Sequence, residues 1–176
     1  MSGLRRPTWR FMFGHPARLI ALGFGAGLAP RAPGTVGTLW AWAAFLIVER
    51  LLGPQPWGWI LLLGTGIGLW ACTRCQQHMQ VDDPGAIVWD EVLAFWLVLW
   101  VAAPSGFVQQ LALFALFRFF DAAKPQPVAW ADALFALKPG AAIGWRHGLG
   151  NLLDDYVAAA CTLLVWALGL ALWRAL

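Results

Sequence analysis

Acidic side chains are scarce in this chain and gathered in a few places, which makes them the first candidates for chemistry. Of nine Asp and Glu residues in 176, only Glu49 stands apart. The other eight form four short stretches: Asp82-Asp83, Asp90-Glu91, Asp121 with Asp132, and Asp154-Asp155. Carboxylates in so apolar a chain are costly unless they are paired, hydrated or bound to a metal. We expect these stretches to meet at one membrane face and to hold a divalent cation.

The type of ligand atom narrows the choice of cation. Oxygen ligands without Cys or His favour a hard cation such as Mg2+, which takes one or two carboxylates, several waters and substrate phosphate oxygens. Cys72 and Cys75 form a C-x-x-C pair, but no second pair completes a zinc or redox site, so helix packing explains them better. His15, His78 and His147 are expected in loops.

The pair Asp90-Glu91 is expected about one turn inside a long apolar helix. Adjacent helical residues point about 100° apart, so one carboxylate could bind a metal while the other orients a ligand or contacts a neighbouring helix. The simpler alternative is a pair solvated at a helix N-terminus, where the helix dipole favours negative charge. Asp154-Asp155 repeats this geometry at the start of the last predicted helix.

Two basic residues flank Asp121. Arg118 precedes it by three residues and Lys124 follows it by three, and the first spacing places Arg118 and Asp121 on one helical face. A local ion pair is the simpler interpretation. The other is a cation beside a metal-binding carboxylate, with both groups facing a phosphate.

A stretch rich in Gly and Thr, residues 33–38, opens a predicted helix. The free N–H groups of a helix N-terminus suit an anion. Gly34 would let the backbone approach closely, and the hydroxyl groups of Thr35 and Thr38 could donate hydrogen bonds. Close helix packing through small residues is an equally good explanation.

Composition sets the environment in which these groups must act. The chain is 60% hydrophobic and 12% charged, with mean hydropathy +0.65, whereas soluble domains carry about 25% charged residues. It is therefore expected to be an integral membrane protein that forms a single domain over residues 1–176. Thirteen Trp residues against one Tyr suit helices with aromatic residues at the lipid interfaces. The basic residues form no stripe or patch, which argues against nucleic-acid binding.

The elements that must position the acids are predicted as an all-α membrane bundle. About five spanning helices are expected, at about 37–52, 57–75, 86–103, 107–120 and 152–173. Residues 19–29 are too short to span, since crossing needs about 20 helical residues, and are expected to be interfacial or re-entrant. Ser105 is a candidate cap for the helix that follows it.

The basic residues predict the orientation of this bundle. On the expected layout two basic residues, Arg50 and Arg174, lie on one side, and ten lie on the other: Arg5, Arg6, Arg10, Arg18, Arg31, Arg74, Arg118, Lys124, Lys138 and Arg146. The positive-inside rule makes the side with ten cytoplasmic. All eight clustered acids fall on that side.

Together these motifs resemble the phosphatidylglycerophosphatase A family, bacterial membrane phosphatases that convert phosphatidylglycerophosphate to phosphatidylglycerol. The resemblance covers roughly residues 19–165 and rests on five ordered stretches: Gly23 to Pro30, Pro33 to Thr38, Ile87 to Glu91, Phe117 to Asp121 with Lys124-Pro125, and Gly148 to Asp155. It implies hydrolysis of a phosphate monoester with Mg2+ at the cytoplasmic face of the bacterial inner membrane. It also implies that the acidic motifs carry the activity.

The resulting site hypothesis assigns a role to each motif. The predicted metal ligands are Asp90, Glu91, Asp121, Asp154 and Asp155, with Glu91 also a candidate general base. The predicted phosphate-binding residues are Gly34, Thr35, Thr38, Arg118 and Lys124. The metal would activate a water and withdraw charge from the phosphate, while the two cations would neutralise the phosphoryl oxygens. Direct attack by water and an aspartyl-phosphate intermediate both remain open, as do the oligomeric state and the number of metal ions.

Two other functions use the same residues differently. A proton- or cation-coupled transporter also needs membrane carboxylates, but it predicts acids near mid-span and a path to the far side. A structural membrane subunit, whose acids only cap helices, predicts that Asp90→Asn leaves catalysis unaffected.

Overall fold

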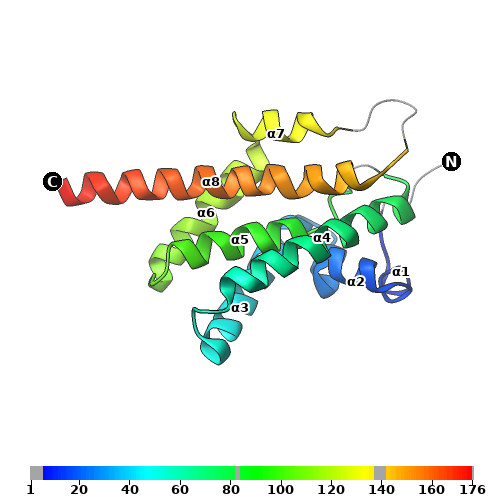
Figure 1. Ribbon diagram of the computed structural model, residues 1–176, viewed down its shortest axis with the longest axis horizontal. Coiled ribbons are helices and arrows are strands. Elements are labelled where there is room, and N and C mark those ends of the chain that lie inside the picture. Colours follow the sequence, from blue (N-terminus) through cyan, green and yellow to red (C-terminus); the bar gives the residue numbers. More distant parts are fainter. Residues whose placement is uncertain (1–5, 82–83, 137–141, 176) are drawn as a thin grey trace.

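The computed structural model describes residues 6–81, 84–136 and 142–175, and every regular element in these ranges is helical (Figure 1). The predicted all-α class is confirmed. The elements are α1 (Trp9–Phe13), α2 (Pro16–Ala21), the 3-10 helix η1 (Gly23–Leu28), α3 (Pro33–Leu52), α4 (Trp57–Met79), α5 (Trp89–Val101), α6 (Phe107–Ala123), α7 (Val128–Leu134) and α8 (Trp145–Ala175).

Helix α5 forms the centre of the bundle. It packs against α3, α4, α6 and α8, and the side chains of Val92, Leu93, Phe95 and Val98 are fully buried. A helix that is apolar all round belongs in a protein interior or a membrane, and in a membrane bundle the close packing of such side chains holds the helices together. This packing fixes the position of the first turn of α5, which carries Asp90 and Glu91.

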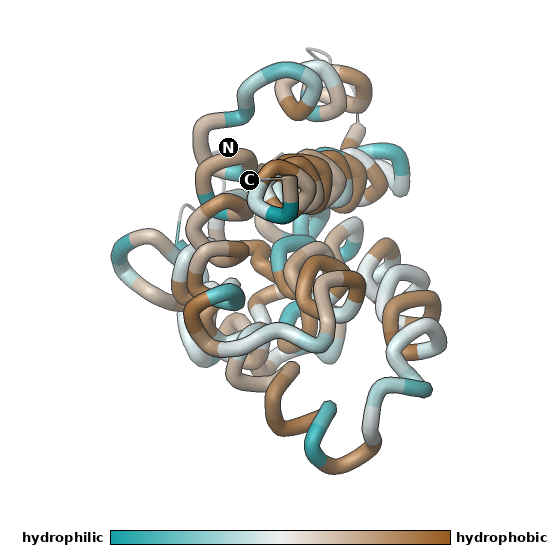
Figure 2. Tube along the Cα trace, turned by 90° about the vertical axis from the view of Figure 1, so that its left-hand side faces the viewer, coloured by the Kyte–Doolittle hydropathy of each residue, from teal (hydrophilic) through white to brown (hydrophobic). Residues whose placement is uncertain are grey.

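Three helices, α3, α4 and α8, are long and apolar enough to cross a membrane by length and composition. They turn large apolar side chains outward, for example Leu46, Leu62 and Leu168. In Figure 2, where α8 is seen nearly end-on behind the C-terminus, most of its turns have the hydrophobic colour. Helices α5 and α6, counted as spans in the sequence-based expectation, have 13 and 17 residues. They are shorter than the roughly 20 residues that a perpendicular crossing needs.

The start of α5 differs from the prediction. The helix begins at Trp89, so Asp90 and Glu91 lie in its first turn and the expected position one turn inside is wrong. Val88 is the N-cap and is not helical, and its N–H, which has no partner within the helix, donates to the Ala21 carbonyl at 2.9 Å. The segment before α5 is thereby tied to the end of α2.

Helix α8 also begins earlier than predicted, at Trp145 rather than near Leu152. Its 31 residues correspond to a length of about 46 Å, and its C-terminal part extends beyond the other helices (Figure 1). Asp154 and Asp155 therefore lie in the third turn of this helix and not at its start.

Two shorter features complete the comparison. Residues 19–29, expected to be interfacial or re-entrant, form the end of α2 and the kinked helix η1, where Phe24 and Gly25 have positive φ angles of 54° and 115°. The predicted capping role of Ser105 is wrong. Gly106 is the N-cap of α6, and its N–H donates to Gln109 Oε1 at 2.8 Å.

Candidate active site

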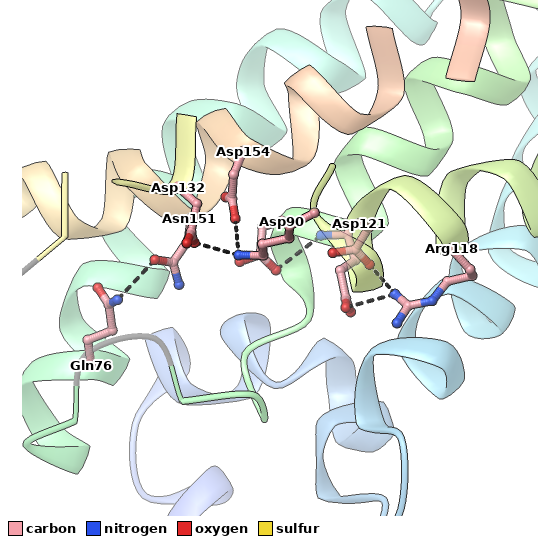
Figure 3. Close-up of polar contacts among 9 residues, drawn as sticks. Gln76, Asp90, Arg118, Asp121, Asp132, Asn151 and Asp154 are labelled. Atoms are coloured by element: carbon pink, nitrogen blue, oxygen red, sulfur yellow. Dashed lines mark hydrogen bonds and ion pairs between the residues drawn. The ribbon is translucent and has the colours of Figure 1, made fainter. Parts of the chain in front are cut away.

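A small cavity of about 130 Å³ lies where the acidic stretches meet. It is lined by the five predicted carboxylates and four further residues: Asp90, Glu91, Asp121, Asp154, Asp155, Gly85, Ile87, Lys124 and Asn151. In Figure 3, Gln76, Asn151, Asp90, Asp121 and Arg118 lie in a row across the helices that supply them. We call this space the acidic cavity.

Five helices contribute residues to the acidic cavity and its surroundings, all at one end of the bundle. The first turns of α3 and α5 meet the last turns of α4 and α6 there, beside the third turn of α8. Asp90 Oδ1 accepts a hydrogen bond from the Glu91 N–H at 3.0 Å. Negative charge at a helix N-terminus is stabilised by about 0.3–1 kcal/mol, so this end of α5 tolerates its two acids.

Arg118 holds carboxylates and does not line the acidic cavity. Its guanidinium donates to Glu91 Oε1 at 2.9 Å and also pairs with Asp121. The local ion pair with Asp121, the simpler interpretation of the sequence, is therefore present. Because these two carboxylates come from α5 and α6, Arg118 ties the two helices together behind the cavity.

Lys124 is the basic side chain that lines the acidic cavity among the described residues. It ends α6 in a left-handed conformation with φ 44°. Its Nζ donates to Asp154 Oδ2 at 2.6 Å and to Asp132 Oδ1 at 2.5 Å. Lys124 therefore joins α6 to α7 and α8 and places a positive charge at the wall of the cavity.

The start of α3 lies beside the Glu91–Arg118 pair. Thr38 Oγ1 donates to the Gly34 carbonyl at 2.9 Å and accepts from Arg118 at 3.3 Å. A Cβ on Gly34 would overlap the Glu91 carboxylate. The residues that line the acidic cavity include neither Gly34, Thr38 nor the half-buried Thr35, and the close-packing explanation accounts for the first two.

Replacing Gly34 with Ala is expected to destabilise the protein by about 1–3 kcal/mol, since overpacking a tight contact forces its neighbours apart. Thermal unfolding in detergent would measure the loss. Gly66→Ala is the matched control, because a Cβ there meets nothing within 4 Å and Ala favours a helix over Gly. Equal unfolding midpoints for the two variants would contradict the contact.

Asn151 is a cavity residue that the sequence-based site did not include. Gln76, which is fully buried near the end of α4, donates to Asn151 Oδ1 at 3.2 Å. The amide of Asn151 is thus oriented from α4 while it lines the acidic cavity. One signal was available in the sequence, because Asn151 precedes Asp154 by three residues and shares its helical face.

Negative charge exceeds positive charge in this region. The five carboxylates that line the acidic cavity face two cationic side chains, Arg118 and Lys124, which leaves a formal excess of three negative charges if all are ionised. Ion pairs engage Glu91, Asp121 and Asp154. Within the described ranges, no three His, Cys, Asp or Glu side chains are placed so that they could hold a metal ion together. The pair Asp82-Asp83 lies outside the described residues.

The remaining candidate ligands have structural contacts. Cys72 and Cys75 are buried, and Cys75 Sγ lies 4.0 Å from Met79 Sδ. The loop assignment was wrong for His78, which lies in α4 and accepts from Arg18 Nε at 3.0 Å, and for His147, which lies in the first turn of α8. His15 is the N-cap of α2.

Comparison with known proteins places these residues in a family. Residues 19–170 match the family model described as Phosphatidylglycerophosphatase A. Two proteins named phosphatidylglycerophosphatase A are similar: that of Escherichia coli K12 is 36% identical over 85% of this chain and 80% of its own length, and that of Haemophilus influenzae is 35% identical over 86% of each.

A third relative has a different name. A Bacteroides thetaiotaomicron protein, whose name proposes a phosphatidylinositol-3-phosphatase, is 30% identical over 86% of this chain and 94% of its own length. No solved structure matches the chain. The family model spans most of the sequence, including every described residue of the acidic cavity, and the chain therefore belongs to the phosphatidylglycerophosphatase A family.

Proposed function

We propose that this phosphatase hydrolyses the terminal phosphate monoester of phosphatidylglycerophosphate, with Mg2+, to give phosphatidylglycerol and phosphate. Membership of the family supports the phosphatase activity and the lipid substrate. The observation that carries the assignment of the site is the acidic cavity, where five carboxylates and Lys124 meet at one end of an apolar bundle.

The proposed location is the cytoplasmic face of the bacterial inner membrane. The excess of Lys and Arg on the side that carries the acids supports this orientation. The cavity is formed at the ends of the apolar helices α3 and α4, which suits a site at the membrane–water interface. There a phosphate headgroup can enter while the acyl chains of the lipid stay in the bilayer.

The types of side chain that line the acidic cavity suit a divalent cation, although their positions in the structure do not bring three carboxylates around one point. Mg2+ prefers carboxylate oxygens and water, and the formal excess of negative charge matches such an ion. The residues proposed to hold it are Asp90, Glu91, Asp121, Asp154 and Asp155. When bound, the ion would supply an activated water and draw charge from the phosphate.

The chain's own groups have complementary roles in this proposal. Lys124 would donate to a phosphoryl oxygen as charge develops there in the transition state. Glu91 Oε1 is held by Arg118, while Glu91 Oε2 is buried and without a hydrogen-bond partner among the described residues. Glu91 Oε2 is therefore the proposed acceptor for a proton of the attacking water.

Removing divalent cations is expected to reduce phosphate release from phosphatidylglycerophosphate to background, and adding Mg2+ back should restore it. Phosphate would be measured with purified protein in detergent. Because a bound ion stabilises the native state, Mg2+ should also raise the unfolding midpoint of the wild-type protein. A full rate in chelator would rule out the metal, and no release by the untreated enzyme would rule out the substrate.

The transporter hypothesis has no comparable support. Of the described acidic residues, five line the acidic cavity, Asp132 pairs with Lys124 beside it, and Glu49 lies near the other end of α3. This distribution lacks the mid-span acids that an ion pathway predicts.

A further inference from the structure

A second, larger cavity adjoins the acidic cavity. It has a volume of about 390 Å³ and is lined by Arg6, Pro7, Gly27, Leu28, Ala29, Pro30, Pro33, Pro84, Gly85 and Ala86. Gly85 lines both spaces. From this juxtaposition we infer that the second cavity binds the glycerol and phosphodiester of the lipid headgroup while the terminal phosphate occupies the acidic cavity. The inference rests on the proposed function, and we call this space the headgroup cavity.

The volumes of the two cavities indicate which part of the headgroup each one can hold. The acidic cavity, at about 130 Å³, has room for a phosphate and a small ion. Phosphatidylglycerophosphate continues beyond that phosphate into a glycerol and then a phosphodiester. The adjoining space of about 390 Å³ is large enough for both groups, and Gly85 stands where the headgroup would pass from one cavity to the other.

The charge of the headgroup cavity is opposite to that of its neighbour. Arg6 is the charged residue among those that line it. A phosphodiester carries one negative charge, and the guanidinium fork matches phosphate oxygens in both charge and geometry. A phosphomonoester held among carboxylates needs added cations, whereas a phosphodiester beside Arg6 does not. This difference in charge orients the headgroup, with the phosphodiester beside Arg6 and the terminal phosphate in the acidic cavity.

The remaining lining suits a glycerol hydroxyl. Pro30, Pro33 and Pro84 lack an N–H, so their backbones offer carbonyl acceptors alone. The walls are also held together, because a Cβ on Gly27 would overlap the Ala86 carbonyl and the Val88 N–H bonds to Ala21. These contacts keep η1 against the segment that leads into α5 and keep the two cavities adjacent.

Exposed aromatic side chains belong to α1, which follows the N-terminal lining residues, and to η1, which supplies part of the lining of the headgroup cavity. Trp9, three residues after Arg6, is 60% exposed and Phe24 of η1 is 49% exposed. Their elements are in contact, since a Cβ on Gly25 would lie 3.0 Å from the Trp9 ring. Aromatic residues favour the level of lipid headgroups, so the diacylglycerol part has an apolar surface on which to leave the cavity toward the bilayer.

The first test measures binding of short-chain phosphatidylglycerol, which has the glycerol and phosphodiester but lacks the terminal phosphate. Titration calorimetry in detergent should show that Arg6→Gln raises its Kd roughly fivefold, the effect of losing a charge-assisted hydrogen bond at an exposed site. The Kd of inorganic phosphate should stay the same. Arg10→Gln is the matched control, because Arg10 is exposed in the same segment and is not among the lining residues.

Any of three results would contradict the proposal that the headgroup cavity binds the glycerol and phosphodiester. They are an unchanged Kd for phosphatidylglycerol in Arg6→Gln, an equal rise in Arg10→Gln, or an equal rise in the Kd of inorganic phosphate. The measurement needs no turnover, so its outcome is separate from that of the proposed function. If the wild-type enzyme releases no phosphate but Arg6→Gln still weakens phosphatidylglycerol selectively, the proposed reaction fails and the lipid site stands.

A second variant tests the passage between the cavities. A Cβ on Gly85 meets nothing within 4 Å, so the backbone accepts a side chain there, and Gly85→Leu adds bulk at the residue that lines both cavities. We expect it to raise the KM for phosphatidylglycerophosphate by about tenfold, close to the effect of one lost favourable contact. Gly169→Leu is the control, since a Cβ there also meets nothing within 4 Å. Equal KM values for both variants would contradict the shared passage.

Discussion

Phosphate release from phosphatidylglycerophosphate is expected to fall at least about a hundredfold when Asp155 is replaced by Asn. Asp155 is 5% exposed and lines the acidic cavity with four other carboxylates. Asn has the same shape but removes one of the negative charges that would hold Mg2+ and orient the attacking water. The loss should appear in kcat and in a higher Mg2+ concentration for half-maximal rate.

The same substitution should leave the fold intact. Removing one of several like charges in a buried cluster relieves repulsion, so the unfolding midpoint of Asp155→Asn should equal or exceed that of the wild type without Mg2+. Glu49→Gln is the matched control, because Glu49 is half-buried near the far end of α3. An Asp155→Asn enzyme that keeps most of the wild-type rate would show that Asp155 does not serve the reaction.

Replacing Arg118 with Met is expected to have the largest effect on stability, about 3–5 kcal/mol, because it leaves buried carboxylates without their cation. The side chains of Arg118, Glu91 and Asp121 are 17%, 13% and 10% exposed. Water therefore replaces the lost ion pairs poorly. Glu91 and Asp121 would move apart, and phosphatase activity should be lost with the stability.

A charge-matched control and a second substitution sharpen this test. Arg74→Met removes an exposed arginine whose contact is Gln77 at 3.4 Å, so unfolding in detergent should change by less than about 0.5 kcal/mol. Adding Glu91→Gln to Arg118→Met should recover part of the stability without restoring activity. Equal stability of Arg118→Met and Arg74→Met would contradict the role of Arg118.

The sequence predicted the helical class and the gathering of the acids because both follow from composition. Few acids in an apolar chain must share their neutralising partners. It could not predict the start of α8, since Gly148 and Gly150 lower helix propensity by about 1 kcal/mol each. In the structure Gly148 lies against Thr73 and Gly150 against Phe135. Tertiary packing therefore overrides the local preference.

The role of Arg118 shows a second limit of the sequence. Its spacing from Asp121 indicated an ion pair, but its other partners, Glu91 and Thr38, come from α5 and α3. Contacts between helices far apart in the chain leave no periodic pattern. The headgroup cavity has the same origin, because its lining comes from the N-terminal segment, η1, the start of α3 and the segment before α5.

The length of α8 sets the distance between the acidic cavity and the C-terminal end of this helix. The helix is continuous from Asp155 to Trp173, a rise of about 27 Å against a hydrocarbon thickness of about 30 Å. Trp173 is 79% exposed and is followed by Arg174, residues that settle at a lipid interface. If Trp173 lies at one interface, the proposed membrane location would put Asp155 close to the other, because α8 is continuous between the two residues.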